Sequence, residues 1–262
     1  MLGAPSLIIF AQRMEYILRL LLIKIIAILK SSFFLVRPGS YLGFLASPFL
    51  FASNSLKLSK WITIQRKKKL GFDDFYKISR NYEDRFKLHQ YVVETEKLEE
   101  VQIFYLEFGV AAGKSFSWWL LKNKHPESRF FGFDTFEGLP VDWGIFKKGE
   151  MAPDQLEFQD KRYQFVRGLF QETLPGFIKT NSFDKKIKKI IHLDADLFSS
   201  TLYTLTTIAE HLNPGDILIF DEFCVPNHEF FAFNIFKESY NFKYETIGAV
   251  NNYLQVALKV TG

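Results

Sequence analysis

Four acidic side chains follow two apolar segments in the C-terminal half of this 262-residue chain. The segment "IIHLDADLF" carries Asp194 and Asp196, and "ILIFDEF" carries Asp221 and Glu222. Like charges repel, so carboxylates that gather at one place usually surround a cation, and their oxygens suit Mg²⁺. Two unrelated helix caps are the alternative, because Asp is common where helices begin. Four acids at neighbouring strand ends favour the metal site.

A glycine turn follows an earlier apolar segment, in "YLEFGVAAGKS" at residues 105–115. A strand is expected to end at Glu107, and a helix is expected to begin near Ser115. Gly109 and Gly113 let the backbone approach a ligand closely, and the free N–H groups of a helix start can bind it. The stretch is neither a Walker loop nor a complete dinucleotide fingerprint. Packing of the strand against the helix is the alternative reason for its glycines.

A further acidic residue, Asp134, ends the apolar segment "RFFGFD". An acidic side chain at the end of the second strand of an α/β sheet can accept both hydroxyls of a ribose. Together with the glycine turn, Asp134 predicts a cofactor that contains adenosine. A purely structural aspartate is the alternative.

Alternating helix and strand patterns begin near residue 83 and must position these residues. Helices are expected at 83–98, 114–124, 200–212 and 233–240. Strands are expected at 102–109, 129–134, 163–168, 188–194 and 216–223, with a final hairpin at 243–249 and 253–260. This order predicts an α/β fold with a doubly wound, mostly parallel, seven-stranded, Rossmann-like sheet. Ligands of such sheets bind at the carboxyl ends of the strands.

Charge divides the chain into two parts. Residues 1–70 contain eleven Lys and Arg against one Glu, whereas the remainder contains 22 basic and 28 acidic residues. We therefore expect a basic N-terminal extension over residues 1–70 and an α/β domain over residues 71–262. The basic "RKKK" at 66–69 lacks interleaved aromatic residues, so we do not expect nucleic acid as a partner.

Residues 14–30 predict an amphipathic helix. Four basic side chains occupy an arc of about 140° at helical spacing, and Leu and Ile fill the rest. These basic residues are Arg13, Arg19, Lys24 and Lys30. Charges near the middle disfavour a membrane-spanning helix, so we expect residues 13–37 to lie on an anionic membrane surface. Packing on the protein's own core, or in the interface of a homo-oligomer, is the alternative.

Three further segments carry weaker signals. Residues 38–56 contain two prolines, two glycines and no charge, which predicts a loop with short turns. Residues 141–165 are polar and aromatic, and we expect either a lid over the substrate or a surface insertion. Cys224 is the single cysteine, which excludes an internal disulfide. We expect a cytoplasmic protein, attached peripherally to the membrane.

Five motifs in order resemble those of the macrocin O-methyltransferase (TylF-like) family. They are "EFGVAAGKS", "GFDTFEGLP", "GLFQETLP", "HLDADLFSST" and "DEF", and the resemblance covers residues 83–260. The family belongs to the class I S-adenosylmethionine-dependent methyltransferases and methylates sugar hydroxyls. The resemblance therefore implies S-adenosylmethionine as cofactor, Mg²⁺ as metal and a sugar-containing acceptor.

The resemblance also implies a role for each motif residue. The implied cofactor-binding residues are Glu107, Gly109, Val110, Gly113, Ser115, Asp134, Phe136 and Gly168. Among these, Asp134 would bind the ribose, and Gly168 would approach the adenine. The usual Arg/Gly-rich loop of the family reads Ala111-Ala112-Gly113 here.

For the acidic motifs, the resemblance implies that Asp194, Asp221 and Glu222 hold Mg²⁺ and that Asp196 is the general base. The family usually has Asp-Asp where this chain has Asp221-Glu222. His192, in the middle of its strand, is expected to be a packed core histidine. Two other functions stay open, namely a glycosyltransferase that uses "DAD" to hold a metal and a sugar nucleotide, and a non-catalytic membrane-bound scaffold.

Overall fold

The computed structural model describes residues 4–138, 147, 149, 156–181 and 187–262. The chain divides into two compact units, Met1–Leu50 and Phe51–Gly262, each described here by itself. The division falls inside helix α3 (Ala46–Lys67). The division at residue 70, expected from charge, stays a prediction.

The first unit is helical. Its elements are α1 (Ala4–Val36), α2 (Gly39–Leu42), the 3₁₀ helix η1 (Gly43–Leu45) and the start of α3. The helix predicted over 14–30 is confirmed and is longer than expected at both ends. The loop predicted over 38–56 is wrong from Ala46 onward, because Pro48 lies in the first turn of α3, where its missing N–H is tolerated. No helix among the described residues combines the length and apolar character needed to cross a bilayer.

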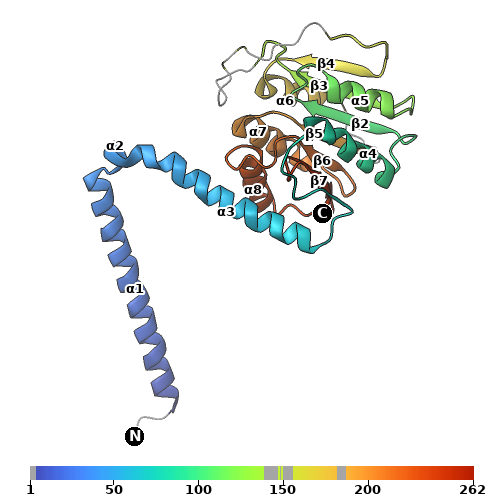
Figure 1. Ribbon diagram of the computed structural model, residues 1–262. Helices are drawn as coiled ribbons and strands as arrows, with labels where there is room; N and C mark the ends of the chain where they lie inside the picture. The colour runs from blue at the N-terminus through green and yellow to red at the C-terminus, as the bar shows by residue number, and fades with distance from the viewer. Residues whose placement is uncertain (1–3, 139–146, 148, 150–155, 182–186) are drawn as a thin grey trace. The chain divides into compact units, whose positions relative to one another are not determined.

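The second unit contains one sheet of eight strands in its described residues, in the order β1-β7-β8-β6-β5-β2-β3-β4 (Figure 1). The strands are β1 (Phe72–Asp73), β2 (Ile103–Phe108), β3 (Arg129–Asp134), β4 (Tyr163–Arg167), β5 (Lys188–Leu193), β6 (Ile217–Phe220), β7 (Tyr244–Val250) and β8 (Gln255–Val260). Strand β8 is antiparallel to both of its neighbours, and all other pairs are parallel. The seven expected strands are confirmed, and the eighth is β1, too short for a sequence pattern to predict.

Helices cover both faces of this sheet (Figure 1). They are α4 (Arg85–Glu96), α5 (Lys114–Lys122), α6 (Phe170–Thr180), α7 (Phe198–Ile208) and α8 (Glu229–Ser239), with 3₁₀ helices η2 (Tyr82–Asp84) and η3 (Ala209–His211). Helices α4 and α5 share one apolar cluster with the sheet, and α3, α6, α7 and α8 share the other. Burial on both faces explains why the strands are apolar without alternation.

Helix α3 is anchored in the second unit by its C-terminal part. Leu58 and Trp61 are buried in the apolar cluster that includes α8. The Trp61 indole N–H donates to the Tyr244 hydroxyl at 2.7 Å, and Asn54 donates to Asn227 at 2.9 Å. This part of the predicted extension therefore belongs to the core of the second unit.

The register of the central strands aligns their carboxyl ends. Phe108 pairs with Phe133 on one side and with Leu193 on the other, and Leu193 pairs with Phe220. The chain leaves β2 for β3 and later returns to β5 on the opposite side of β2, so the strand order reverses there. Such a reversal opens a crevice at the carboxyl ends of the strands.

Candidate active site

A cavity of about 520 Å³ lies at these carboxyl ends. Such a volume is typical of cofactor and ligand sites. Among the predicted site residues, those that line it are Glu107, Gly109, Val110, Ser115, Asp134, Asp194, Asp196 and Glu222. The structure thus brings both groups of motifs to one cavity. The predicted residues outside its lining are Gly113, Phe136, Gly168 and Asp221.

The glycine turn approaches strand β5 very closely. Gly109 has a φ of +92°, and a Cβ built there would lie 1.9 Å from the Asp194 carbonyl oxygen. Only glycine therefore fits at this position. Gly113, with a φ of +69°, precedes α5, and the nearby Ser115 hydroxyl is buried with no hydrogen-bond partner among the described residues. A ligand in the cavity can provide the missing partner.

Asp134 fixes the shape of this turn. Its Oδ2 accepts hydrogen bonds from the backbone N–H of Val110 at 2.8 Å and of Ala111 at 2.9 Å. Its Oδ1 accepts the Phe136 N–H at 2.8 Å. A carboxylate oxygen can accept more than one hydrogen bond, so Asp134 can also bind a ribose hydroxyl. We call residues 109–115 and 134–136 the turn half of the cavity.

Two predicted residues outside the cavity lining support the turn half, Phe136 within it and Gly168 next to it. Phe136 takes a φ of +56°, and the Arg167 guanidinium lies 5.0 Å from its ring centroid. Gly168 follows β4 with a φ of +134°, and its N–H donates to the Asp134 carbonyl at 3.0 Å. Gly168 thus holds β4 beside the end of β3.

A buried ionic network lies beneath the cavity. The Glu107 carboxylate accepts a hydrogen bond from Tyr105, and His192 Nδ1 lies 3.5 Å from Glu107 and 2.9 Å from the Tyr105 hydroxyl. His192 Nε2 lies 3.8 Å from an Asp221 oxygen. Burial lowers the pKa of His192, but the two carboxylates outweigh it and raise that pKa to about 10. His192 is buried as expected, and the two neighbouring carboxylates favour its protonated form.

We call residues 194–196 and 221–222 the acid half of the site, although Asp221 lies outside the cavity lining. Burial, with the nearby charges of Asp221 and Asp134, raises the pKa of Asp196 to about 6. Burial, with the charges of Asp196 and Asp221, raises the pKa of Glu222 to about 7. Burial and Asp221 also raise the pKa of Asp194. Carboxylates with raised pKa values in a cavity are candidates for proton transfer near neutral pH.

Asp221 has different surroundings from the other three acids. It is fully buried, and its Oδ2 accepts hydrogen bonds from the Tyr82 hydroxyl and from Arg85 Nη1, the latter at 3.3 Å. Gln255 donates to its backbone carbonyl at 3.0 Å. Burial favours the neutral acid, but His192 and Arg85 outweigh it and lower the pKa of Asp221. Asp221 is therefore an anion held by protein cations.

The predicted metal ligands do not converge in this structure. Asp194 and Glu222 line the cavity, whereas Asp221 does not line it and faces Arg85 and His192. Within the described ranges, no group of three or more His, Cys, Asp or Glu side chains is arranged to hold a metal ion. The ligand set implied by the resemblance therefore does not fit a divalent cation here.

Tyr82 and Arg85 are site residues that the motifs do not include. Both line the cavity, and they precede Asp221 by 139 and 136 positions along the chain. Arg85 is the first residue of α4, and its guanidinium lies 4.4 Å from the centroid of the Tyr82 ring. The sequence offers one local sign of these residues, an Arg near the start of the helix predicted over 83–98. That Arg alone does not indicate that its partner is Asp221.

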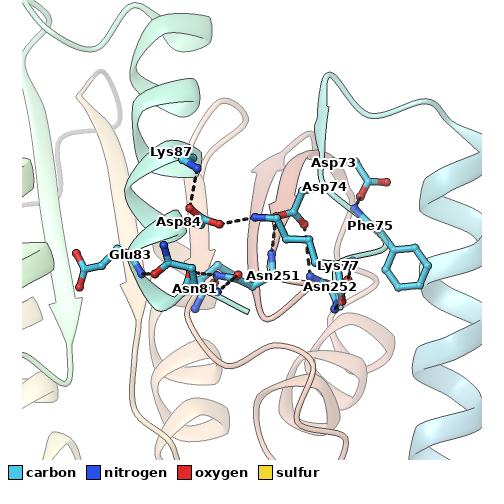
Figure 2. Close-up of polar contacts among 11 residues, drawn as sticks. Asp73, Asp74, Phe75, Lys77, Asn81, Glu83, Asp84, Lys87, Asn251 and Asn252 are labelled. Carbon is cyan, nitrogen blue, oxygen red and sulfur yellow. Dashed lines mark hydrogen bonds and ion pairs between the residues drawn. The ribbon is translucent and has the colours of Figure 1, made fainter. Parts of the chain in front are cut away.

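The strap, which we define as residues 73–84, holds these two residues in place (Figure 2). Its Lys77 N–H donates to the Asn252 side chain at 2.7 Å, and its Asn81 N–H donates to the Asn251 side chain at 3.1 Å. Asp84 in turn binds Lys77, and it binds Lys87 at 2.7 Å (Figure 2). The strap is thus fixed to the connection between β7 and β8, and η2 and α4 begin at its end.

The predicted lid over 141–165 falls largely outside the described residues, since 141–146, 148 and 150–155 are not among them. Of the rest, Leu156 and Phe158 face the turn half. A Cβ at Gly113 would lie 3.1 Å from Leu156 and 3.3 Å from Phe158.

Comparison with known proteins finds methyltransferases by sequence and by fold. Residues 106–223 match the family described as "Methyltransferase domain", a range that contains every predicted site residue. The structure is similar to CalS11, a calicheamicin methyltransferase, with a TM-score of 0.54, 18% identity, and coverage of 79% of this chain and 91% of that one. It is also similar to the O-methyltransferase NovP, with a TM-score of 0.50, 17% identity, and coverage of 69% and 79%. No sequence among curated proteins matches.

Residues 106–223 therefore match a methyltransferase domain, and the prediction of a Rossmann-like fold is confirmed. The matched range does not include Tyr82 or Arg85. Membership of the narrower macrocin O-methyltransferase family stays a prediction.

Proposed function

We propose that this chain transfers the methyl group of S-adenosylmethionine to a hydroxyl group of a sugar-containing acceptor. The observation that carries this proposal is the single cavity that joins the turn half to the acid half. The methyltransferase match supports methyl transfer, and the resemblance of the five motifs to the macrocin O-methyltransferases supports a sugar hydroxyl.

The turn half fits the cofactor. Gly109 leaves room for close backbone approach, and Asp134 has acceptor capacity for ribose hydroxyls. The Ser115 hydroxyl has no hydrogen-bond partner within the described part of the chain. When bound, the sulfonium of S-adenosylmethionine supplies an electrophilic methyl group. The protein must then exclude water and orient an oxygen nucleophile toward that methyl.

The acid half fits the acceptor. A sugar hydroxyl is a poor nucleophile, and it must lose its proton as its oxygen bonds to the methyl carbon. Asp196 lines the cavity, and its pKa of about 6 leaves the carboxylate mostly ionised near neutral pH. Asp196 is therefore the proposed general base that takes this proton. Mg²⁺ has no part in this proposal, since Asp221 faces Arg85 and His192 rather than the other two predicted ligands.

Calorimetric titration of the full-length protein with S-adenosylhomocysteine tests the cofactor assignment. We expect one binding site, and weaker binding by Asp134→Asn, whose amide nitrogen cannot accept the backbone N–H groups. Glu137→Gln, an exposed neighbour of the same turn, is the matched control. Binding of a sugar nucleotide with no binding of S-adenosylhomocysteine would contradict methyl transfer and favour a glycosyltransferase.

We further propose that α1 attaches the enzyme to an anionic membrane surface. All large apolar side chains of α1 from Phe10 to Val36 are exposed. Basic side chains at Arg13, Arg19, Lys24 and Lys30 accompany them, with Glu15 as the only acidic residue among the first 50. Apolar surface combined with basic charge is typical of helices that lie on anionic lipid.

Flotation with lipid vesicles tests this attachment. Full-length protein should float with vesicles that contain phosphatidylglycerol and much less with pure phosphatidylcholine. The triple variant Arg19→Gln, Lys24→Gln and Lys30→Gln should float less. The matched control replaces three exposed lysines of the second unit, Lys161, Lys179 and Lys243, by Gln. Equal flotation of both triple variants would contradict the proposal, as would stable oligomers without lipid binding.

A further inference from the structure

The carboxylate of Asp221 already has its countercharges within the protein. Its Oδ2 lies 3.3 Å from Arg85 Nη1, and its Oδ1 lies 3.8 Å from His192 Nε2. The Tyr82 hydroxyl donates to the same Oδ2. Oδ1 has no hydrogen-bond partner among the described residues, but a metal ion there would lie beside the Arg85 guanidinium and would be repelled by it.

Arg85 is held firmly in this position. Its side chain is buried, and its guanidinium lies 4.4 Å from the Tyr82 ring centroid and 5.1 Å from that of Phe86. The preceding residue, Asp84, is fixed by Lys77 and Lys87 at the end of the strap (Figure 2). Moving Arg85 away from Asp221 would therefore disturb both the stacking and the strap.

The geometry points to Arg85 as the cation of the acid half, in the place that the motifs predict for Mg²⁺. This assignment rests on the proposed function, because it concerns how the acid half prepares an acceptor hydroxyl. Arg85 lines the cavity, and its buried Nε has no hydrogen-bond partner among the described residues. A guanidinium presents five N–H donors in a fixed plane, so Arg85 can both neutralise Asp221 and donate to an acceptor oxygen. Methyl transfer then needs no divalent cation.

Mn²⁺ titration followed by electron paramagnetic resonance tests this assignment without an acceptor. Wild-type protein should show no stoichiometric Mn²⁺ site. Arg85→Met keeps the apolar stem, removes the charge and frees Asp221, so it should bind Mn²⁺ at least about tenfold more tightly than the wild type. Arg85→Lys retains a cation and should not gain the site. Lys179→Met, at an exposed position of α6 away from the strap, is the matched control and should behave as the wild type.

The same variants give a second readout if Arg85→Met folds poorly. Mn²⁺ should raise the melting temperature of Arg85→Met but not that of the wild type, because a ligand stabilises the state that binds it. A stoichiometric Mn²⁺ site in the wild type that Asp221→Asn removes would overturn the assignment, as would no gain of Mn²⁺ binding in Arg85→Met by either readout. Titration with S-adenosylhomocysteine separates the two proposals, since its failure would count against the proposed function and leave the Mn²⁺ result unaffected.

Discussion

The two halves of the cavity are built in different ways. In the turn half, Asp134 binds the backbone of Val110, Ala111 and Phe136, so the acid and its partners lie on two consecutive strand ends. In the acid half, Asp221 depends on Tyr82 and Arg85, which come from a distant part of the chain. In the turn half, neutral backbone N–H groups bind the carboxylate. In the acid half, charged side chains neutralise it. The turn half can therefore form from local geometry, whereas the acid half needs the strap.

We expect the largest effect from a substitution in the acid half that lowers the rate of methyl transfer without changing cofactor affinity. Asp196→Asn should lower the rate of methyl transfer by about 10²- to 10⁴-fold, the usual contribution of a general base. Its affinity for S-adenosylhomocysteine should stay near that of the wild type, because the cofactor is proposed to bind in the turn half. Transfer of a tritiated methyl group to a panel of glycosides, together with calorimetry, measures both. A variant that transfers at the wild-type rate would remove Asp196 from the mechanism.

A single methyl group placed in the turn half should have the next largest effect. Gly109→Ala puts a Cβ 1.9 Å from the Asp194 carbonyl at a φ of +92°, so the ends of β2 and β5 must separate. Displacement of about 1 Å at a binding site can cost about 100-fold, and we expect a loss of that size in affinity for S-adenosylhomocysteine. Gly176→Ala, where nothing lies within 4 Å of the added Cβ, should bind normally. Equal affinities would show that the close approach is not needed.

The ionic network beneath the cavity should give the acid half a pH-dependent stability. The pKa of His192 is about 10 in the folded protein and about 6.5 when unfolded, so its protonated form stabilises the fold below pH 6.5. That contribution falls as pH rises from 6.5 through 10, at no more than about 1.4 kcal/mol per pH unit. Urea unfolding at pH 7 and pH 9 should therefore show a larger loss in the wild type than in His192→Gln. Parallel losses in both proteins would mean that His192 is neutral.

The smallest expected effect concerns the strap. Asn251→Ala removes side-chain hydrogen bonds to the N–H and carbonyl of Asn81 and to Gln255. We expect the free energy of unfolding to fall by about 1–3 kcal/mol, the cost of leaving such groups without partners. Affinity for S-adenosylhomocysteine should not change, since the strap serves the acid half. A loss of cofactor affinity at unchanged stability would contradict the separation of the two halves.

The sequence predicts the turn half better than the acid half for a physical reason. Helix and strand periodicity places Glu107, Asp134 and Asp194 at strand ends, and parallel strands bring those ends to one edge. Glycine at position 109 signals close approach directly, because no other residue tolerates that backbone.

The partners of Asp221 leave no such local signal. Arg85 and Tyr82 meet it only through strand order and through the strap, which are properties of the whole sheet. Strand β1 is missed for the same reason, since its two residues gain their pairing from β7. Like-charge repulsion correctly predicts that the acids need a cation, but the motif cannot identify which cation supplies the charge.

Contacts between the N-terminal part of the second unit and its later strands constrain the order in which the unit can fold during synthesis. The hydrogen bond from Trp61 to Tyr244 cannot form until another 183 residues have been synthesised, and the bond from Asn81 to Asn251 needs another 170. At typical elongation rates this delay is roughly 10–40 s, during which α3 and the strap have emerged from the ribosome without their partners. Strand β8, which lies between β6 and β7, is the last of the described strands to be synthesised. Arg85 can therefore be fixed beside Asp221 only after the connection between β7 and β8 has been made, and a nascent chain stalled before β7 should already contain the turn half but not the acid half.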